Sequence, residues 1–245
     1  MAEQRLDKLI ASTGRWSRRE VKILVREGRV LVDGFPAKSA DEKVDPAKST
    51  IEVDGVDIGY REKTYIMLHK PAGLLTATED RHQKTVMDLL SADLRRLDIA
   101  PVGRLDKDTE GLLLLTDDGE LAHRLLAPKS HVDKVYYAEL DAPLKEADIR
   151  AFEEGIVLAD GTRCMSAGLA LIGDGTKALI TLREGKFHQV KRMTASRGAT
   201  VLYLKRLSMG PLKLDESLSR GTYRFLSEEE IGALRAAVGE DAKTI

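Results

Sequence analysis

An aspartate stands among charged residues directly before an unbroken apolar run. Asp106 lies in Gly103–Gly111, with the sequence GRLDKDTEG, and Leu112–Leu115 come immediately after it. Such a run predicts a strand that is buried on both faces of a sheet. Catalytic groups often lie on loops that a rigid strand supports. Taken alone, the segment also fits an ordinary surface turn, so Asp106 is a candidate carboxylate that needs support from elsewhere in the chain.

A second segment carries two adjacent tyrosines on a predicted strand. It spans Lys134–Glu139, with the sequence KVYYAE. Because side chains alternate along a strand, Tyr136 and Tyr137 face opposite sides. One ring can pack in the core while the other reaches a cleft, where it could stack on a nucleic-acid base. Packing of both rings in the core is the alternative.

A third segment, Arg183–Met193, combines cations with a predicted helix over Phe187–Arg197. On a helix, His188, Lys191 and Arg192 share one face, and the apolar residues between them turn towards the core. A cationic helix face can keep a carboxylate ionised or bind phosphates. The alternative is a helix face that is simply solvated.

The N-terminal region concentrates positive charge. Between Gln4 and Arg29 there are eight basic and three acidic residues, a net charge of +5. Clustering of this kind favours a phosphate-binding surface over an ordinary exposed helix face. The eight basic residues, which we expect to bind RNA, are Arg5, Lys8, Arg15, Arg18, Arg19, Lys22, Arg26 and Arg29.

Composition limits the class of protein. The 245 residues are 42% hydrophobic and 32% charged, which is typical of a globular chain with one large domain or two smaller ones. No apolar run approaches the roughly 20 residues of a membrane helix, and the N-terminus lacks the apolar region of a signal peptide. Cys164 is the single cysteine, which excludes an intrachain disulfide and a cysteine metal cluster. These features predict a soluble protein of the reducing cytoplasm.

Local signals divide the chain into a small module and a larger one. Two short helices, the second opened by a capping box at Ser17, and a hairpin around Asp54–Gly55 predict a compact unit. Residues 59–63 are polar and are interpreted as a linker. From about Thr64 onward strands and helices mix, including a predicted helix over Thr85–Leu97 and a last helix opened by a second capping box at Ser227. This mixture indicates an α+β domain around one large sheet.

The N-terminal module resembles the S4 RNA-binding domain. The resemblance rests on RLDKLIA, SRREVK and GRVLVDG in that order, and it covers roughly residues 3–58. It implies two helices that form a basic face for structured RNA. The expected organisation is therefore an S4 domain at 1–58, a linker at 59–63 and a catalytic domain at 64–245.

The three candidate segments together resemble the pseudouridine synthases that act on ribosomal RNA. The motifs are GRLDxDTxGLLLLTxDG, KxY and EGxFHQVKRM. The HKPAG and LKRLSMGPL segments are similar to the small-subunit branch, which modifies uridine 516 of 16S rRNA. The resemblance implies an α+β fold with a mixed-sheet catalytic domain, and isomerisation of uridine to pseudouridine.

The resemblance also implies roles for individual residues. Asp106 matches the catalytic aspartate, and Tyr136 the tyrosine that packs on the flipped base and can take the proton from C5. Lys191 matches the basic residue that pairs with the aspartate, and Arg104 the arginine that contacts the RNA backbone or holds the site open. Whether the carboxylate attacks the sugar or the base, or removes a sugar proton, stays open. So does the choice of Leu179 or Ile180 as the apolar wall beside the base.

The expected partner is ribosomal RNA, either naked 16S rRNA or a small-subunit assembly particle. The protein is expected to act as a monomer and not to bind a membrane. His188 and Arg192 are further expected RNA contacts. Isomerisation consumes no redox equivalent, nucleotide or metal, and the sequence contains no motif for any of them, so no cofactor is expected. Two alternatives remain. One is the same chemistry on 23S rRNA, and the other is a non-catalytic RNA-binding assembly factor, which would not need Asp106 in an anionic-RNA cleft.

Overall fold

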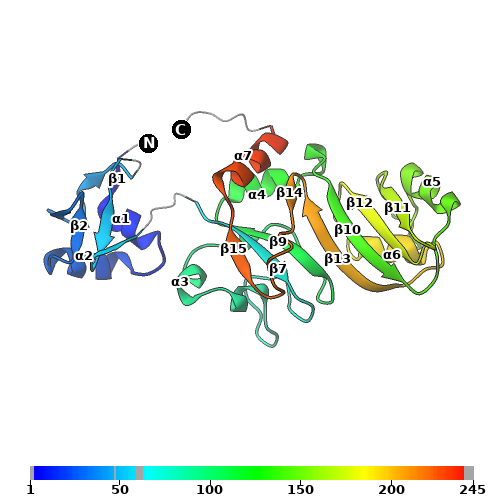
Figure 1. Cartoon of the computed structure of the whole chain (residues 1–245), viewed down its shortest axis with the longest axis horizontal. Coiled ribbons are helices and arrows are strands. Elements are labelled where there is room, and N and C mark those ends of the chain that lie inside the picture. The colour runs from blue at the N-terminus through cyan, green and yellow to red at the C-terminus, as the bar shows by residue number, and fades with distance from the viewer. Residues whose placement is uncertain (1–2, 47, 59–62, 240–245) are drawn as a thin grey trace. The chain divides into compact units, whose positions relative to one another are not determined.

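The computed structural model describes residues 3–46, 48–58 and 63–239, which form two compact units. One unit comprises the described residues up to Thr64 together with Leu90–Ile99, and the other comprises Tyr65–Leu89 and the described residues from Ala100 onward (Figure 1). Four of the five expected linker residues, 59–62, lie outside the described residues. In the described ranges, no helix has both the length and the apolar character needed to cross a membrane.

In the first unit, two of the helices pack with short strands around a core of their own. The helices are α1 (Leu6–Ala11) and α2 (Arg18–Arg26), and their buried residues include Leu9 and Leu24. The larger sheet has the order β3-β2-β5-β6, and a separate strand pair joins β1 to β4. The strands are β1 (Gln4–Arg5), β2 (Val30–Val32), β3 (Phe35–Pro36), β4 (Lys43–Val44), β5 (Ile51–Val53) and β6 (Val56–Asp57).

Two local signals in this unit act as the sequence predicts. The Ser17 hydroxyl accepts from the Glu20 amide, and the Glu20 carboxylate accepts from the Ser17 amide at 2.6 Å, so the capping box is confirmed. Asp54 and Gly55 both have positive φ, of 55° and 74°, and connect β5 to β6. Positive φ at both positions matches the right-handed twist of a hairpin, as predicted.

The second unit is built on one nine-stranded mixed sheet, which confirms the α+β prediction. Its main path runs β11-β12-β10-β13-β9-β7-β15, with β14 paired to β13 and β8 to β9 (Figure 1). The strands are β7 (Tyr65–Lys70), β8 (Ala100–Pro101), β9 (Glu110–Thr116), β10 (Lys134–Leu140), β11 (Gly168–Ile172), β12 (Lys177–Leu182), β13 (Val201–Met209), β14 (Leu212–Lys213) and β15 (Tyr223–Phe225).

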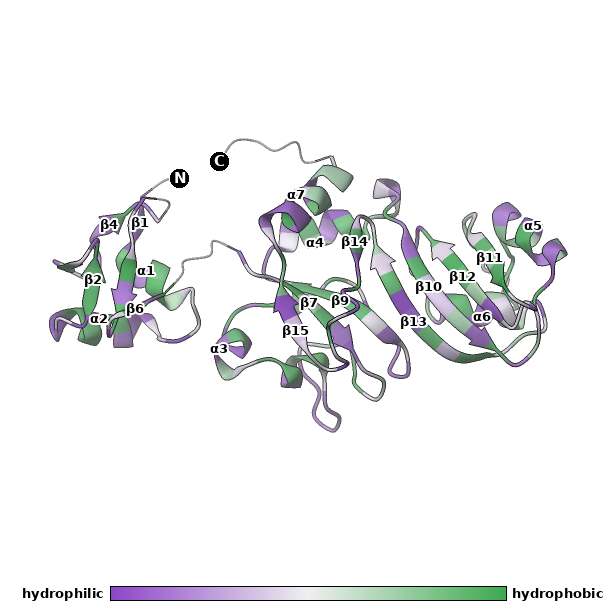
Figure 2. Ribbon diagram, viewed as in Figure 1, coloured by the Kyte–Doolittle hydropathy of each residue, from purple (hydrophilic) through white to green (hydrophobic). Residues whose placement is uncertain are grey.

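Strand β9 joins the two halves of this sheet. It pairs with β7 along its length and with β13, in parallel, only at its first two residues. Leu112–Leu115 are fully buried, as predicted, and Figure 2 shows the apolar character of this strand. At Gly111, φ is 105° and a Cβ would overlap the Arg206 carbonyl oxygen, so only glycine lets β13 approach. This close approach fixes the point at which the Asp106 loop enters the sheet.

The helices of the second unit pack around the sheet. They are η1 (Val86–Leu89), α4 (Gly119–Leu126), η2 (Pro128–Ser130), α5 (Glu146–Glu154), α6 (Gln189–Ala195) and α7 (Glu228–Ala237). Helix α7 begins with the predicted capping box at Ser227 and buries Leu234 in the core that also contains Met67 and Leu112.

The prediction of one helix over Thr85–Leu97 is wrong. The structure has the short 3₁₀ helix η1, an extended Ser91 with ψ 158°, and then α3 (Ala92–Arg95). The Asp88 carboxylate accepts from the Thr85 amide at 2.8 Å, which caps η1 locally. Apolar spacing alone could not reveal this break, because both short helices bury apolar residues, Val86 and Met87 in η1 and Leu94 in α3.

Candidate active site

Asp106 lies on the loop before β9, and two buried side chains hold this loop. Thr76 donates from its hydroxyl to the Leu105 carbonyl at 2.8 Å and accepts from the Leu105 amide at 3.3 Å. The Gly73 amide also donates to the Lys107 carbonyl at 2.7 Å. The residues on both sides of Asp106 are thereby fixed to the segment from Gly73 to Thr76, so the carboxylate is held in a defined position.

Lys70 is the second buried support of the loop, and sequence reasoning gave it no role. Its ammonium lies 2.9–3.2 Å from the carbonyl oxygens of four residues, Pro71, Asp106, Lys107 and Thr109. The side chain is fully buried, and burial lowers its pKa to about 8. The signal that could have found it is the lysine of HKPAG, the last residue of β7.

The Asp106 carboxylate is paired with cations from the segment that begins α6. Lys191 Nζ lies 3.1 Å from one carboxylate oxygen, and His188 Nε2 lies 3.6 Å from the other. The His188 contact is an ion pair only when the ring is protonated. The Asp106 side chain is 27% exposed, so solvent screens these contacts only in part. The predicted pairing of Asp106 with Lys191 is thus present in the geometry.

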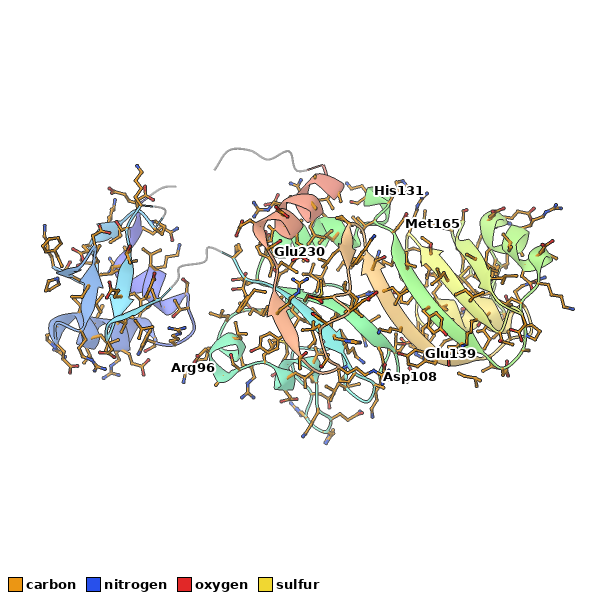
Figure 3. All side chains as sticks on the ribbon, in the orientation of Figure 1. Arg96, Asp108, His131, Glu139, Met165 and Glu230 are labelled. Carbon is orange, nitrogen blue, oxygen red and sulfur yellow. The ribbon has the colours of Figure 1, made fainter. Side chains whose placement is uncertain are left out.

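Lys191 also binds a second carboxylate. Its Nζ lies 2.6 Å from Asp108, which projects from the same loop and is labelled in Figure 3. Burial alone would lower the pKa of Lys191, but the hydrogen bonds to Asp108 and Asp106 outweigh it and raise the pKa above its ordinary value. The hydrogen bond from Lys191 in turn lowers the pKa of Asp108. Lys191 therefore stays charged throughout the neutral range.

The turn before α6 differs from the predicted helix. The sequence predicts a helix from Phe187, but α6 begins at Gln189, and His188 has a left-handed backbone with φ 48°. A polar network fixes the turn: the side-chain amide of Gln189 donates to Glu184 at 2.7 Å, and the Lys186 ammonium pairs with Glu184. The backbone amide of Met165 donates to the same carboxylate at 2.8 Å.

The structure does not bring all three predicted cations of this segment together. His188 and Lys191 border Asp106, whereas the Arg192 guanidinium pairs with Asp160 at 2.5 Å and does not line the same cavity. Because His188 precedes the helix, the helical spacing that placed Arg192 beside it does not apply. The expected role of Arg192 in RNA binding stays a prediction.

A cavity of about 570 Å³ opens beside Asp106. Volumes of this size are typical of sites for small organic groups, and they accommodate a nucleotide base. Tyr136 on β10 lines the cavity and is 9% exposed, while Tyr137 faces the other side, where its hydroxyl donates to Glu139 at 2.8 Å. The prediction that these tyrosines face opposite sides is confirmed, and Tyr136 is the one at the cavity.

The apolar wall of the cavity is formed by leucines other than Leu179, and not by Ile180. Leu182 and Leu204 line it. Ile180 is buried and directly opposite Tyr136 in the β10–β12 register, so it shares that face, whereas Leu179 is opposite Tyr137. Within the described residues, neither Leu179 nor Ile180 lines the cavity. The strand register therefore puts Ile180, and not Leu179, on the same face as Tyr136, but the residue of β12 that lines the cavity is Leu182.

Two further cations that line the cavity are buried. Lys134 is 6% exposed and Arg206 is 1% exposed. The Arg206 Nε donates to the Leu112 carbonyl at 2.8 Å, and its Nη2 has no hydrogen-bond partner among the described residues. Burial, and then the Arg206 charge, lower the pKa of Lys134. Lys134 is the lysine of the KxY motif, and Arg206 lies in LKRLSMGPL. The spacing of these motifs did not reveal that both side chains are buried.

Arg104 is exposed and lines the cavity two residues before Asp106. Within the described part of the chain its side chain has no hydrogen bond or ion pair, so its guanidinium is available to a ligand. This placement is compatible with its predicted contact to the RNA backbone.

The eight basic residues of the first unit do not all lie around one hollow. A hollow is lined by Arg5, Arg18, Arg19 and Lys22 around the buried Asp7. Asp7 accepts from both Arg5 and Arg18, at 3.1 and 2.9 Å.

The remaining four basic residues lie outside this hollow. Arg29 is held by Asp54 at 2.7 Å and by Glu27 at 3.1 Å, and Lys8, Arg15 and Arg26 do not line the hollow either. A phosphate-binding surface on this unit is therefore best supported around Asp7.

These contacts define what the arrangement can do. The Asp106 carboxylate stands at the edge of a partly apolar cavity, with a flat aromatic ring on one wall and basic side chains around it. Such a site can enclose a planar base, hold its phosphates and expose its sugar to a carboxylate. In the described part of the chain, no group of three His, Cys, Asp or Glu side chains is placed to hold a metal ion.

Comparison with known proteins agrees with this site. Residues 64–196 match the RNA pseudouridylate synthase family, and residues 4–48 match the S4 domain. An uncharacterised RNA pseudouridine synthase of Bacillus subtilis is 48% identical and covers 94% of this chain and 98% of its own length. The ribosomal small subunit pseudouridine synthase A of Vibrio cholerae is 38% identical and covers 94% of this chain and 99% of its own.

A solved structure extends the comparison to the fold. A crystal structure of a pseudouridylate synthase matches with a TM-score of 0.67 at 36% identity, covering 94% of this chain and 99% of that one. The family matches and the relatives agree with the resemblance seen in the motifs. The chain therefore belongs to the RNA pseudouridine synthase family and carries an S4 domain ahead of its catalytic domain.

Proposed function

We propose that this enzyme isomerises one uridine of 16S rRNA, at the position equivalent to uridine 516, and that Asp106 supplies the catalytic carboxylate. The observation that carries the chemistry is the pairing of Asp106 with Lys191 at the mouth of a cavity that Tyr136 lines. The choice of 16S rRNA is supported by the small-subunit enzyme of Vibrio cholerae, which matches along nearly the whole length of both chains.

The reaction exchanges one bond for another within the same nucleotide. The bond between the sugar C1′ and the base N1 breaks, the base turns, and C1′ joins C5. The proton on C5 leaves, and N1 gains a proton, so the product is an isomer and no external oxidant or group donor is consumed. The free base must stay in the site between the two bond changes, which requires an enclosed cavity with a flat wall.

Each site residue has a distinct part in this proposal. The target is flipped out of the RNA at a cost of a few kcal/mol, which phosphate contacts from Arg104 and the basic hollow of the first unit offset. Tyr136, which lines the cavity, packs on the flipped base in this proposal and takes the C5 proton. Lys191 pairs with Asp106, and Lys70 and Thr76 hold the loop of Asp106 in position.

The domain organisation is part of the proposal. We assign residues 1–58 to the S4 RNA-binding domain and 64–245 to the catalytic domain, supported by the family matches and by the separate apolar cores of the two units. We further propose that the enzyme acts as a monomer in the cytoplasm, where ribosomal RNA is assembled. Sedimentation of the purified chain tests the first point, and fractionation of cells tests the second.

The test of the target is to delete the gene and map pseudouridine across all stable RNAs. The proposal expects that one 16S site disappears while 23S rRNA and tRNA keep every site. Loss of a 23S site with all 16S sites intact would overturn the 16S assignment but leave the chemistry at Asp106 standing. Retention of every site would favour a non-catalytic binding role.

A further inference from the structure

Phe187 is an exposed aromatic side chain at the rim of the active-site cavity. It is 74% exposed, and it lines the same cavity as Asp106 and Tyr136. The chain has only four phenylalanines, and single exposed apolar residues are common on protein surfaces, so exposure alone carries no argument. The position of the ring and the way it is held are what distinguish it.

The backbone presents this ring in a fixed direction. The Phe187 and His188 rings are stacked, with centroids 3.8 Å apart and planes at 19°. His188 has the left-handed φ of 48°, which is an unfavourable conformation for a residue with a side chain and occurs where surrounding structure enforces it. The Glu184 network with Lys186 and Gln189 provides that enforcement. One face of Phe187 is covered by His188, and the ring remains largely open to solvent.

The flipped uridine itself cannot be the group that covers Phe187. That base needs the enclosed part of the cavity, where Tyr136 is 9% exposed, whereas Phe187 lies at the open edge. When one nucleotide leaves a stack, its neighbours lose a stacking partner. Aromatic side chains commonly replace such a partner, because every base has a flat π face.

The charges around the ring also suit a nucleotide. Lys186 and Arg104 line the cavity with Phe187, and Lys191 lies on the helix that begins two residues after it. Cations near an exposed ring can hold the phosphates on either side of a stacked base. Lys186 is paired with Glu184 and Lys191 with two aspartates, so Arg104 is the cation that, within the described residues, an apolar partner would leave without a counterpart.

We propose that the stacked Phe187–His188 pair is a platform for the base next to the target uridine. This inference rests on the proposed function, and it adds a binding contact for a nucleotide that is not itself modified. Stacking is tolerant of base identity, so the platform contributes affinity and holds the RNA open, and it does not read sequence.

The test is a double-mutant cycle on RNA affinity with the full chain. The inactive Asp106→Asn background prevents turnover, and the RNA is a 16S hairpin around the target uridine with an abasic nucleotide on its 5′ or its 3′ side. The enzyme variants are Phe187→Ala, Phe187→Leu and Phe187→Trp. Leu202→Ala is the matched control, because Leu202 is 71% exposed and does not line the cavity.

If the Phe187–His188 pair is such a platform, the variants should lose RNA affinity in a specific pattern. Phe187→Ala should weaken binding of the intact hairpin about 5- to 100-fold. An abasic nucleotide at one of the two neighbouring positions should cost the same, and the two changes together should cost no more than either alone. Phe187→Trp should retain affinity, Phe187→Leu should lose it, and Leu202→Ala should bind as the parent does.

Additive losses at both neighbouring positions would overturn the inference, since they mean that Phe187 does not touch those bases. Unchanged affinity of Phe187→Ala would overturn it as well. Turnover of the intact hairpin by the unaltered enzyme is measured first, and its failure would count against the 16S assignment. The cycle is then run on the hairpin around the uridine that the deletion map identifies, so the two ideas fail separately.

Discussion

Removal of the Lys191 charge is the sharpest perturbation of the site. Lys191 Nζ lies 3.1 Å from Asp106 and 2.6 Å from Asp108, and its side chain is 24% exposed. Lys191→Met deletes this cation and nearly keeps the side-chain volume. Hydrogen bonds to a charged group contribute about 1.5–3 kcal/mol. If Asp106 needs this contact in the transition state, kcat/KM should fall by about 10- to 150-fold.

The pH dependence gives this prediction its sign. The raised pKa of Lys191 means that its charge is present at every pH below its ordinary value of 10.5 and is lost only as the pH rises through the raised value. The parent enzyme should therefore show no loss from Lys191 between about pH 6 and pH 10.

The assay is single-turnover formation of pseudouridine, with RNA affinity measured separately. Lys177→Met, an exposed lysine of β12 that does not line the cavity, is the control for the general loss of one positive charge. The reasoning is refuted if Lys191→Met weakens RNA binding and leaves the single-turnover rate at saturating RNA unchanged. That result would make Lys191 a phosphate contact.

Three other predictions concern stability and RNA binding. The hydrogen bond from Arg5 lowers the pKa of Asp7 to about 2 from its ordinary 3.8. Asp7 should therefore stabilise the first unit by about 2 kcal/mol above pH 4, and this stabilisation should be lost as the pH falls through 2. Hydrogen exchange of the parent chain and of Asp7→Asn, compared across this pH range, measures the effect. Burial lowers the pKa of Lys70 to about 8, so the free energy of unfolding should rise with pH between about 8 and 10.5, and urea unfolding of Lys70→Met should lack this rise. Replacing exposed Arg19 and Lys22 together by glutamine should reduce the salt slope of RNA binding by about 1–2 units, and an unchanged slope would show that the hollow does not bind phosphate.

Local signals in the sequence predicted much of the fold. The capping boxes at Ser17 and Ser227, the Asp54–Gly55 hairpin and the buried strand at Leu112–Leu115 depend on neighbours in the chain, and all four are present. The single helix over Thr85–Leu97 failed, because an extended Ser91 interrupts an apolar spacing that two short helices share equally well.

The residues of the site could be predicted where a family motif identifies them, and less well where their role depends on burial in the folded sheet. The pairing of Asp106 with Lys191 and the position of Tyr136 at the cavity agree with the motif-based assignment. Lys70 and Arg206 lie inside quoted motifs but were missed, because the motifs do not show that these side chains are buried against carbonyl groups. Their contacts depend on strands that only the folded sheet brings together.

The left-handed residue before α6 shows the same limit. Residues 187–197 carry a helical pattern, and no local rule predicts that His188 leaves it. The turn is set by the Glu184 carboxylate, which accepts hydrogen bonds from residues on both sides in sequence, Met165 and Gln189. Its consequence is that His188 reaches Asp106 while Arg192 pairs with Asp160 instead.

The central claim is that the Asp106 carboxylate performs the isomerisation, and release of tritium from C5 of uridine in 16S rRNA tests it most directly. Asp108→Asn is the matched control, because Asp108 is on the same loop, binds the same lysine and has a side chain that is 73% exposed. We expect Asp106→Asn to bind the RNA with nearly full affinity and release no tritium, while Asp108→Asn keeps most of the parent activity. Tritium release by Asp106→Asn above that of a blank reaction would contradict the assignment.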